Sequence, residues 1–145
     1  MLLNDEYFMK AAIKEAQQAF YKNEVPIGAV IVCQNQIIAR SHNLTETLND
    51  VTAHAEMQAI TSAANYLGGK YLTGCTLFVT VEPCPMCAGA LYWSQIDKIV
   101  YGIADEKRGY NMISTKLLHP KTTVKSGIGE VEILKLMKTF FQNKR

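Results

Sequence analysis

The stretch "TAHAEMQAITSAANYLGG", residues 52–69, combines a helical pattern with two chemically active side chains. Its alanines recur every four residues, as on one face of a helix, and the two glycines at its end favour termination. His54 and Glu56 fall in the predicted first turn. The sequence therefore predicts a helix that presents a histidine and a carboxylate where the chain enters it.

A second stretch, "VEPCPMCAGA" at residues 81–90, places Cys84 and Cys87 three residues apart at a predicted junction between strand and helix. Side chains at i and i+3 point to one side of a helix, and a helix N-terminus stabilises thiolates. Two thiolates and the imidazole of His54 could bind zinc and leave one coordination position open for water. Glu56 would then move protons, so the pattern predicts a catalytic zinc site.

Other interpretations of the two cysteines stay open at this point. A thioredoxin-like redox pair has the same C-x-x-C spacing, although it normally has no His-x-Glu upstream. The pair could also be structural, without any chemistry. A closed zinc site would need a fourth ligand, and Cys33 or Cys75 could supply it, although both border apolar strands, where cysteine acts as a small hydrophobe. Glu56 favours the catalytic interpretation, because a purely structural site has no use for it.

The composition predicts one ordered domain outside the membrane. Of the 145 residues, 48% are hydrophobic and 19% are charged, which is enough for a sizeable core. No apolar run approaches the ~20 residues that span a bilayer, and the acidic N-terminal segment does not resemble a secretory signal. We therefore expect a cytoplasmic protein, whose cysteines serve metal or redox chemistry more readily than disulfides.

Basic residues concentrate in the last third of the chain. Residues 98–145 hold ten Lys or Arg against four Asp or Glu, whereas residues 1–97 hold five against nine. Such a segment can be a solvated basic helix, or it can bind an anionic partner such as nucleic acid. The charge distribution alone does not choose between the two.

Apolar periodicity predicts alternating helices and strands. The helices are expected at residues 5–22, 52–69, 84–95 and 129–145, and the strands at 27–33, 37–42, 76–81 and 98–103. The first two strands form a hairpin. The later strands alternate with helices, so we expect them to be parallel in a sheet that carries helices on both faces. Residues 117–128 have no clear pattern.

The two opening stretches match the signature of zinc nucleobase deaminases, H-x-E followed by P-C-x-x-C. The matching residues are His54-Ala55-Glu56 and Pro83-Cys84-Pro85-Met86-Cys87. Beyond the signature, the chain resembles the bacterial tRNA adenosine deaminases, which convert the wobble adenosine of an anticodon to inosine. The similar segments, spread over residues 23–145, are "NEVPIGAVIV", "HNLTETLNDVTAHAEMQAI", "LFVTVEPCPMCAGAL", "KIVYGIADEKRG", "LLHP" and "FFQNKR".

This resemblance implies an architecture and a reaction. The expected fold is a single zinc-dependent deaminase domain over residues 1–145, a cytidine-deaminase-like three-layer α/β/α sandwich with a five-stranded mixed sheet. The expected assembly is a homodimer with one Zn²⁺ per subunit. The expected reaction is hydrolytic deamination of adenosine in a tRNA anticodon stem-loop.

The resemblance also implies roles for individual residues. His54, Cys84 and Cys87 would be the zinc ligands, and Glu56 would carry protons while activated water attacks C6 of adenine and ammonia leaves. The residues expected around the flipped nucleoside are Asn43, the backbone near Ala55, and the wall formed by Glu24, Val25, Pro26 and Ile27. Taken alone, Asn43 could be a turn residue, and the apolar members of the wall could belong to the core.

Contacts with RNA are expected from two further segments. Asp105 would lie near the flipped nucleotide, and Lys107 and Arg108 would meet phosphates. The tail residues Phe140, Phe141, Lys144 and Arg145 resemble the aromatic and basic ending of the family, where aromatic rings stack on unpaired bases and cations meet phosphates. The two phenylalanines are adjacent on a predicted helix, which leaves open whether one of them belongs to the core.

The chain departs from the family pattern near its end. Residues 121–139, "KTTVKSGIGEVEILKLMKT", are a few residues fewer than the family usually has there, which predicts an abbreviated fifth strand and leaves the tail helix unplaced. The segments "CPMC" and "LYWSQ" also resemble guanine deaminases of the same superfamily. Guanine, or another free base or nucleoside, is therefore the alternative substrate, and a zinc-stabilised binding module without catalysis is a further alternative.

Overall fold

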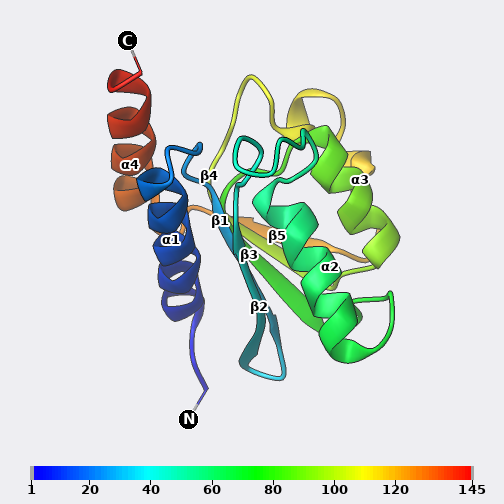
Figure 1. The fold of residues 1–145 in the computed structure, drawn as a ribbon. Coiled ribbons are helices and arrows are strands. Elements are labelled where there is room, and N and C mark those ends of the chain that lie inside the picture. The colour runs from blue at the N-terminus through cyan, green and yellow to red at the C-terminus, as the bar shows by residue number, and fades with distance from the viewer. Residues whose placement is uncertain (1, 145) are drawn as a thin grey trace.

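The computed structural model describes residues 2–144 and contains a five-stranded sheet between two layers of helices (Figure 1). The strands are β1 (Gly28–Cys33), β2 (Gln36–His42), β3 (Cys75–Val81), β4 (Lys98–Ile103) and β5 (Thr123–Ser126). The helices are α1 (Asp5–Tyr21), α2 (Ala55–Leu67), α3 (Pro85–Ser94), α4 (Glu130–Gln142) and the short η1 (Tyr110–Met112) and η2 (Thr115–Leu117). The predicted α/β/α sandwich is confirmed.

The order of the strands in the sheet is β2-β1-β3-β4-β5. β1 is antiparallel to both β2 and β3, whereas β3, β4 and β5 are parallel to one another. The predicted hairpin and the predicted parallel strands are therefore both present. Because α3 connects β3 to β4, the carboxyl ends of these two strands meet at one edge of the sheet, where ligands bind in open α/β sheets.

The helices divide between the two faces of the sheet, with α1 and α4 on one face and α2 and α3 on the other (Figure 1). Asn4 caps α1 as expected from its sequence, since its Oδ1 accepts the N–H of Tyr7 at 2.9 Å. α1 packs closely on β1 at Gly28, where an added Cβ would lie 2.1 Å from the carbonyl oxygen of Ala12. A side chain at this position would push the helix away from the sheet.

The C-terminal region follows the expectation of an abbreviated strand. β5 has four residues, all exposed, and it completes the sheet beside β4. α4 then returns across the face that α1 covers and buries Ile133 and Phe140. None of the helices within residues 2–144 has the length and apolar character needed to cross a bilayer.

Candidate active site

The N-termini of two helices bring a histidine and two cysteines together. His54 is the N-cap of α2, Cys84 is the N-cap of α3, and Cys87 lies in the first turn of α3. The Nδ1 atom of His54 lies 3.6 Å from Sγ of Cys84 and 3.5 Å from Sγ of Cys87. One ligand atom from each residue falls within 4.8 Å of the others, so the three residues are placed to hold one metal ion.

The chemistry of these donors suits zinc. The hydrogen bond between the two cysteines lowers the pKa of Cys84 to about 4, and the same hydrogen bond, together with burial, raises the pKa of Cys87. Metal binding requires both sulfur atoms as thiolates and releases any proton they carry. Two sulfurs and one imidazole nitrogen are ligands that zinc prefers, and three protein ligands are typical of a catalytic zinc site.

The alternative fourth ligands lie elsewhere. Cys33 and Cys75 face each other in register across β1 and β3, and neither belongs to the group of metal-binding side chains found among residues 2–144. Burial raises the pKa of Cys75 to about 12, which makes it a poor thiolate donor. The structure therefore does not support the closed zinc site considered from the sequence, and it favours the open, three-ligand arrangement.

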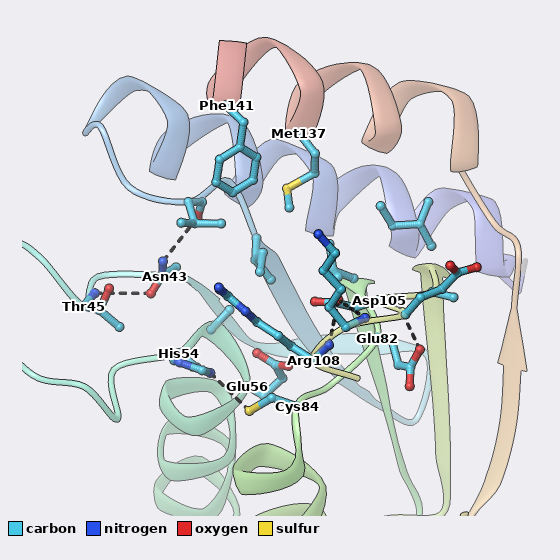
Figure 2. Close-up of a pocket in the computed structure, with 18 residues that line it drawn as sticks. Asn43, Thr45, His54, Glu56, Glu82, Cys84, Asp105, Arg108, Met137 and Phe141 are labelled. Atoms are coloured by element: carbon cyan, nitrogen blue, oxygen red, sulfur yellow. Dashed lines mark hydrogen bonds between the residues drawn. The ribbon is translucent and has the colours of Figure 1, made fainter. Parts of the chain in front are cut away.

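Glu56 lies beside the metal-binding group. It is the second residue of α2 and only 4% exposed, and burial raises the pKa of its carboxyl group to about 7. Its carboxylate faces the same space as His54 and Cys84 (Figure 2). A carboxyl group that titrates near neutral pH can both accept and donate a proton, which is what a general acid–base catalyst requires.

A cavity of about 780 Å³ opens above these residues. Its lining includes most of the residues expected to contact substrate, namely Val25, Ile27, Asn43, Ala55, Asp105, Lys107, Arg108 and Phe141. Figure 2 shows Asn43, Glu56 and Arg108 on the side of the cavity near the metal-binding residues, with Phe141 reaching in from α4. Glu24, Pro26, Phe140 and Lys144 were also expected to contact substrate or RNA, but the structure does not bring them to this lining.

Asn43 is held in the wall of the cavity. Its Nδ2 donates to the carbonyl oxygen of Val25 at 3.4 Å, and its Oδ1 accepts the N–H of Thr45 at 3.2 Å. Ser41 supports another part of the lining, since its Oγ donates to the carbonyl oxygen of Ala55 at 2.6 Å. These contacts give Asn43 one orientation, with part of its hydrogen-bonding capacity still available to a ligand.

Glu24 serves the loop after β2 instead of the cavity wall. Its carboxylate accepts the N–H of Glu46 at 3.1 Å, and the N–H and Oγ1–H of Thr47 each at 2.6 Å. Burial alone would raise the pKa of this carboxyl group, but the hydrogen bonds from Thr47 and Glu46 outweigh it, and the pKa falls below the ordinary 4.5. The buried carboxylate of Glu24 therefore fixes the loop that carries Asn43 and Thr45.

Replacing Glu24 with glutamine should lower the free energy of unfolding at pH 7 by about 2 kcal/mol, because hydrogen bonds to a charged acceptor are lost. A carboxyl group whose pKa is lower in the folded state stabilises the fold above pH 4.5, and this contribution is lost progressively as the pH falls from 4.5 through the lowered folded-state pKa. Urea unfolding should therefore show a larger difference between variant and parent at pH 7 than at pH 3. Glu46→Gln, an exposed carboxylate in the same loop, is the control, and an equal loss in both variants would contradict this role.

The tail residues separate into core and cavity. Phe140 is 6% exposed and packs against Phe20 with ring centroids 6.2 Å apart, whereas Phe141 is 51% exposed and lines the cavity. Lys144 donates from Nζ to Oδ1 of Asn23 and lies 5.1 Å above the ring of Phe140. Phe140 is thus a core residue. Stacking on an RNA base stays a prediction for Phe141 alone. Arg145 lies outside the described residues.

Seven lining residues were not anticipated from the sequence: Thr45, Val81, Glu82, Ile103, Ala104, Glu106 and Met137. Met137 could have been found, because it lies four residues before Phe141 and so shares its helix face. Glu82 had a weaker signal, as an acidic residue that ends an apolar strand just before Pro83. Its carboxylate is buried and accepts the N–H groups of Asp105 and Asn111, each at 3.0 Å.

Comparison with known proteins agrees with this geometry. Residues 3–103 match the family described as the cytidine and deoxycytidylate deaminase zinc-binding region. The tRNA-specific adenosine deaminase of Bacillus subtilis (strain 168) is 46% identical over 99% of this chain and 92% of its own length. A solved tRNA:A34 deaminase is 42% identical, covers 90% of this chain and 98% of its own, and superposes with a TM-score of 0.83. A solved Bacillus subtilis guanine deaminase is 41% identical over 70% of this chain and 66% of its own, with a TM-score of 0.67.

The fold, the His–Cys–Cys group and the matched region define the class: the protein is a zinc-dependent deaminase of the cytidine and deoxycytidylate deaminase type. Within this class, the relatives that are similar over nearly the whole chain are tRNA-specific adenosine deaminases. The chain belongs to the family of the tRNA-specific adenosine deaminases.

Proposed function

We propose that this protein deaminates adenosine to inosine at the wobble position of a tRNA anticodon. The observation that carries the proposal is one cavity whose lining combines Glu56 and the metal-binding residues His54 and Cys84 with Lys107, Arg108 and Phe141. The cavity therefore combines residues suited to deamination with residues of the kinds that bind single-stranded RNA. The names of the relatives point to the same substrate.

In this proposal, the metal-binding group and Glu56 divide the chemistry. His54, Cys84 and Cys87 hold zinc, which supplies the Lewis acidity that makes water nucleophilic near neutral pH. Glu56 accepts a proton from the attacking water and delivers it to N1 of adenine; it then takes the second proton from the new hydroxyl at C6 and passes it to the amine, which leaves as ammonia while C6 becomes a carbonyl. Its raised pKa, near 7, suits both the accepting and the donating step.

The upper cavity would bind the flipped nucleoside and its neighbours. Val25 and Ile27 offer an apolar wall to the base, and the fixed amide of Asn43 offers hydrogen bonds to polar groups of the nucleoside. Asp105 lies at the rim with Lys107 and Arg108, whose cations would meet the phosphates on either side. The net positive charge of residues 98–145 then has a function in the approach of RNA.

Free guanine is the second candidate substrate, favoured by the similarity to the guanine deaminase from Bacillus subtilis. One experiment separates the two: zinc-assayed protein is incubated with an anticodon stem-loop that carries a wobble adenosine and, in parallel, with guanine. We expect inosine in the stem-loop, detected by nuclease digestion and chromatography. Xanthine without inosine would reject the RNA substrate and keep the zinc chemistry.

We also propose that the protein acts as a homodimer in the cytoplasm, where tRNA is its substrate. Large apolar side chains are exposed on α2 and α3 and at the end of η1, and exposed apolar patches mark interfaces. They are Tyr66, Leu67, Met86, Trp93, Met112 and Ile113, and Trp93 is 76% exposed. Light scattering of the purified protein measures the assembly, and a monomer would reject it.

Phe140 and Phe141 should give opposite results when each is replaced by alanine. Phe140→Ala should lower the free energy of unfolding by about 3 kcal/mol, because it leaves a cavity in the core. Phe141→Ala should leave stability within about 0.5 kcal/mol of the parent and weaken stem-loop binding about tenfold through loss of a stacking surface. Urea unfolding and fluorescence anisotropy measure the two effects, and equal behaviour of the two variants would contradict the division.

A further inference from the structure

Glu82 is a buried acid that the proposed chemistry does not use. It follows β3 directly and lies two residues before Cys84, and it is 6% exposed. None of the ion pairs formed within residues 2–144 involves it. Its two oxygens instead accept backbone groups, Oε1 from Asp105 and Oε2 from Asn111. Burying a carboxylate costs free energy unless hydrogen bonds offset that cost. For Glu82, the segment that contains Asp105 and Asn111 supplies these hydrogen bonds.

The segment between these two contacts is the loop 105–111, which carries the charged rim of the cavity. Within it, Oδ1 of Asp105 accepts the N–H groups of Lys107 at 3.2 Å and Arg108 at 3.0 Å. The N–H of Gly109 then returns to the carbonyl oxygen of Asp105 at 2.8 Å. The loop is therefore a tight turn whose two ends are both fixed by Glu82.

Gly109 fits against the Glu82 carboxylate from the other side. A Cβ at position 109 would lie 2.2 Å from Oε2 of Glu82 and 2.6 Å from the carbonyl oxygen of Asp105. Only a residue without a side chain allows this approach. The absence of a side chain at position 109 and the carboxylate at position 82 thus define one joint between the metal-binding segment and the rim.

We infer that Glu82 and Gly109 are positioning residues for substrate RNA: they fix the loop so that Lys107 and Arg108 stand over the cavity. The inference rests on the proposed function, since it assigns the rim to phosphate contacts. Glu82 does not touch the substrate in this scheme. Its effect on RNA passes through the two cations, and this dependence can be measured.

The test is a double-mutant cycle on stem-loop binding, measured by fluorescence anisotropy with zinc-assayed protein. Glu82→Gln is made in the parent and in the Lys107→Ala/Arg108→Ala background. The carboxamide oxygen can accept only one of the two N–H groups, while its NH₂ opposes the other. Glu6→Gln, an exposed acid near the N-terminus of α1, is the matched control for loss of charge.

We expect Glu82→Gln to weaken binding about tenfold in the parent and less than about twofold in the background that lacks both cations, with zinc content unchanged. Gly109→Ala should show the same dependence, because its Cβ would displace the Glu82 carboxylate while the residues 82–84 themselves stay unchanged. An equal loss in both backgrounds, or no loss, would overturn the inference. Loss of zinc in both variants would also overturn it, because the joint would then serve the metal site.

Amide hydrogen exchange keeps this inference separate from the proposed function. The N–H groups of Asp105 and Asn111 are bonded to Glu82 in the protein alone, so their exchange can be measured without RNA. The exchange of at least one of these two N–H groups should become about tenfold faster in Glu82→Gln, since each such bond contributes on the order of a tenfold factor. If the parent does not bind the stem-loop but exchange is faster in Glu82→Gln, the proposed function is rejected. The role of Glu82 in fixing the loop is then still supported. Unchanged exchange would reject the joint itself.

Discussion

Glu56→Gln should reduce deamination of the stem-loop about 10³-fold and leave zinc content, fold and RNA binding intact, because general acid–base catalysis typically contributes 10²–10⁴-fold. Glutamine has the same shape and fills the same buried site, but it cannot accept the proton of the attacking water. The measurement is single-turnover inosine formation at saturating enzyme, together with zinc analysis and anisotropy of stem-loop binding.

Glu6→Gln is a closely matched control for this substitution. Glu6 is the second residue of α1, as Glu56 is of α2, so both changes remove the same charge from the first turn of a helix. Glu6 is exposed, whereas Glu56 is buried beside the metal-binding group. A Glu56→Gln variant that kept parental activity would support the binding module without catalysis and reject the enzymatic role.

The chemistry at the base of the cavity was predictable from the sequence because its parts are local. His54 and Glu56 are two residues apart, and Cys84 and Cys87 are three apart, so helix geometry alone brings each pair to a helix N-terminus. The sheet then needs only to place two such termini side by side, which the strand-to-helix order implies. The short strand β5 had no clear pattern because all four of its residues are exposed.

The supports of the cavity could not be predicted in the same way, because they depend on contacts between distant segments. Glu24 had been expected in the cavity wall, yet its carboxylate turns to the backbone of Glu46 and Thr47, 22 and 23 residues further along the chain. Glu82 similarly binds the backbone of Asn111, 29 residues away. Backbone N–H groups occur at nearly every position, so no residue type in the sequence marks which of them a carboxylate will bind.

Removal of zinc should both inactivate and destabilise the protein, because the metal joins the N-termini of α2 and α3. Zinc present at 1,000 times its dissociation constant stabilises the folded state by about 4 kcal/mol, which corresponds to roughly 10 °C in the melting temperature of a domain of this size. Cys87→Ser, at a buried ligand position, should reproduce the loss produced by a chelator. Calorimetry with zinc analysis measures both effects.

Cys33→Ser is the control for Cys87→Ser. It shows whether zinc is lost because a ligand is removed or because any cysteine is replaced. Cys33 is half-buried at the end of β1, opposite Cys75 and outside the metal-binding group, so its variant should keep one zinc per chain and full activity. Loss of zinc in Cys33→Ser would instead indicate a fourth thiolate ligand and a closed site. If Cys33→Ser keeps zinc and Cys87→Ser loses it, the site has three protein ligands. The fourth coordination position is then open to water, which hydrolytic deamination requires.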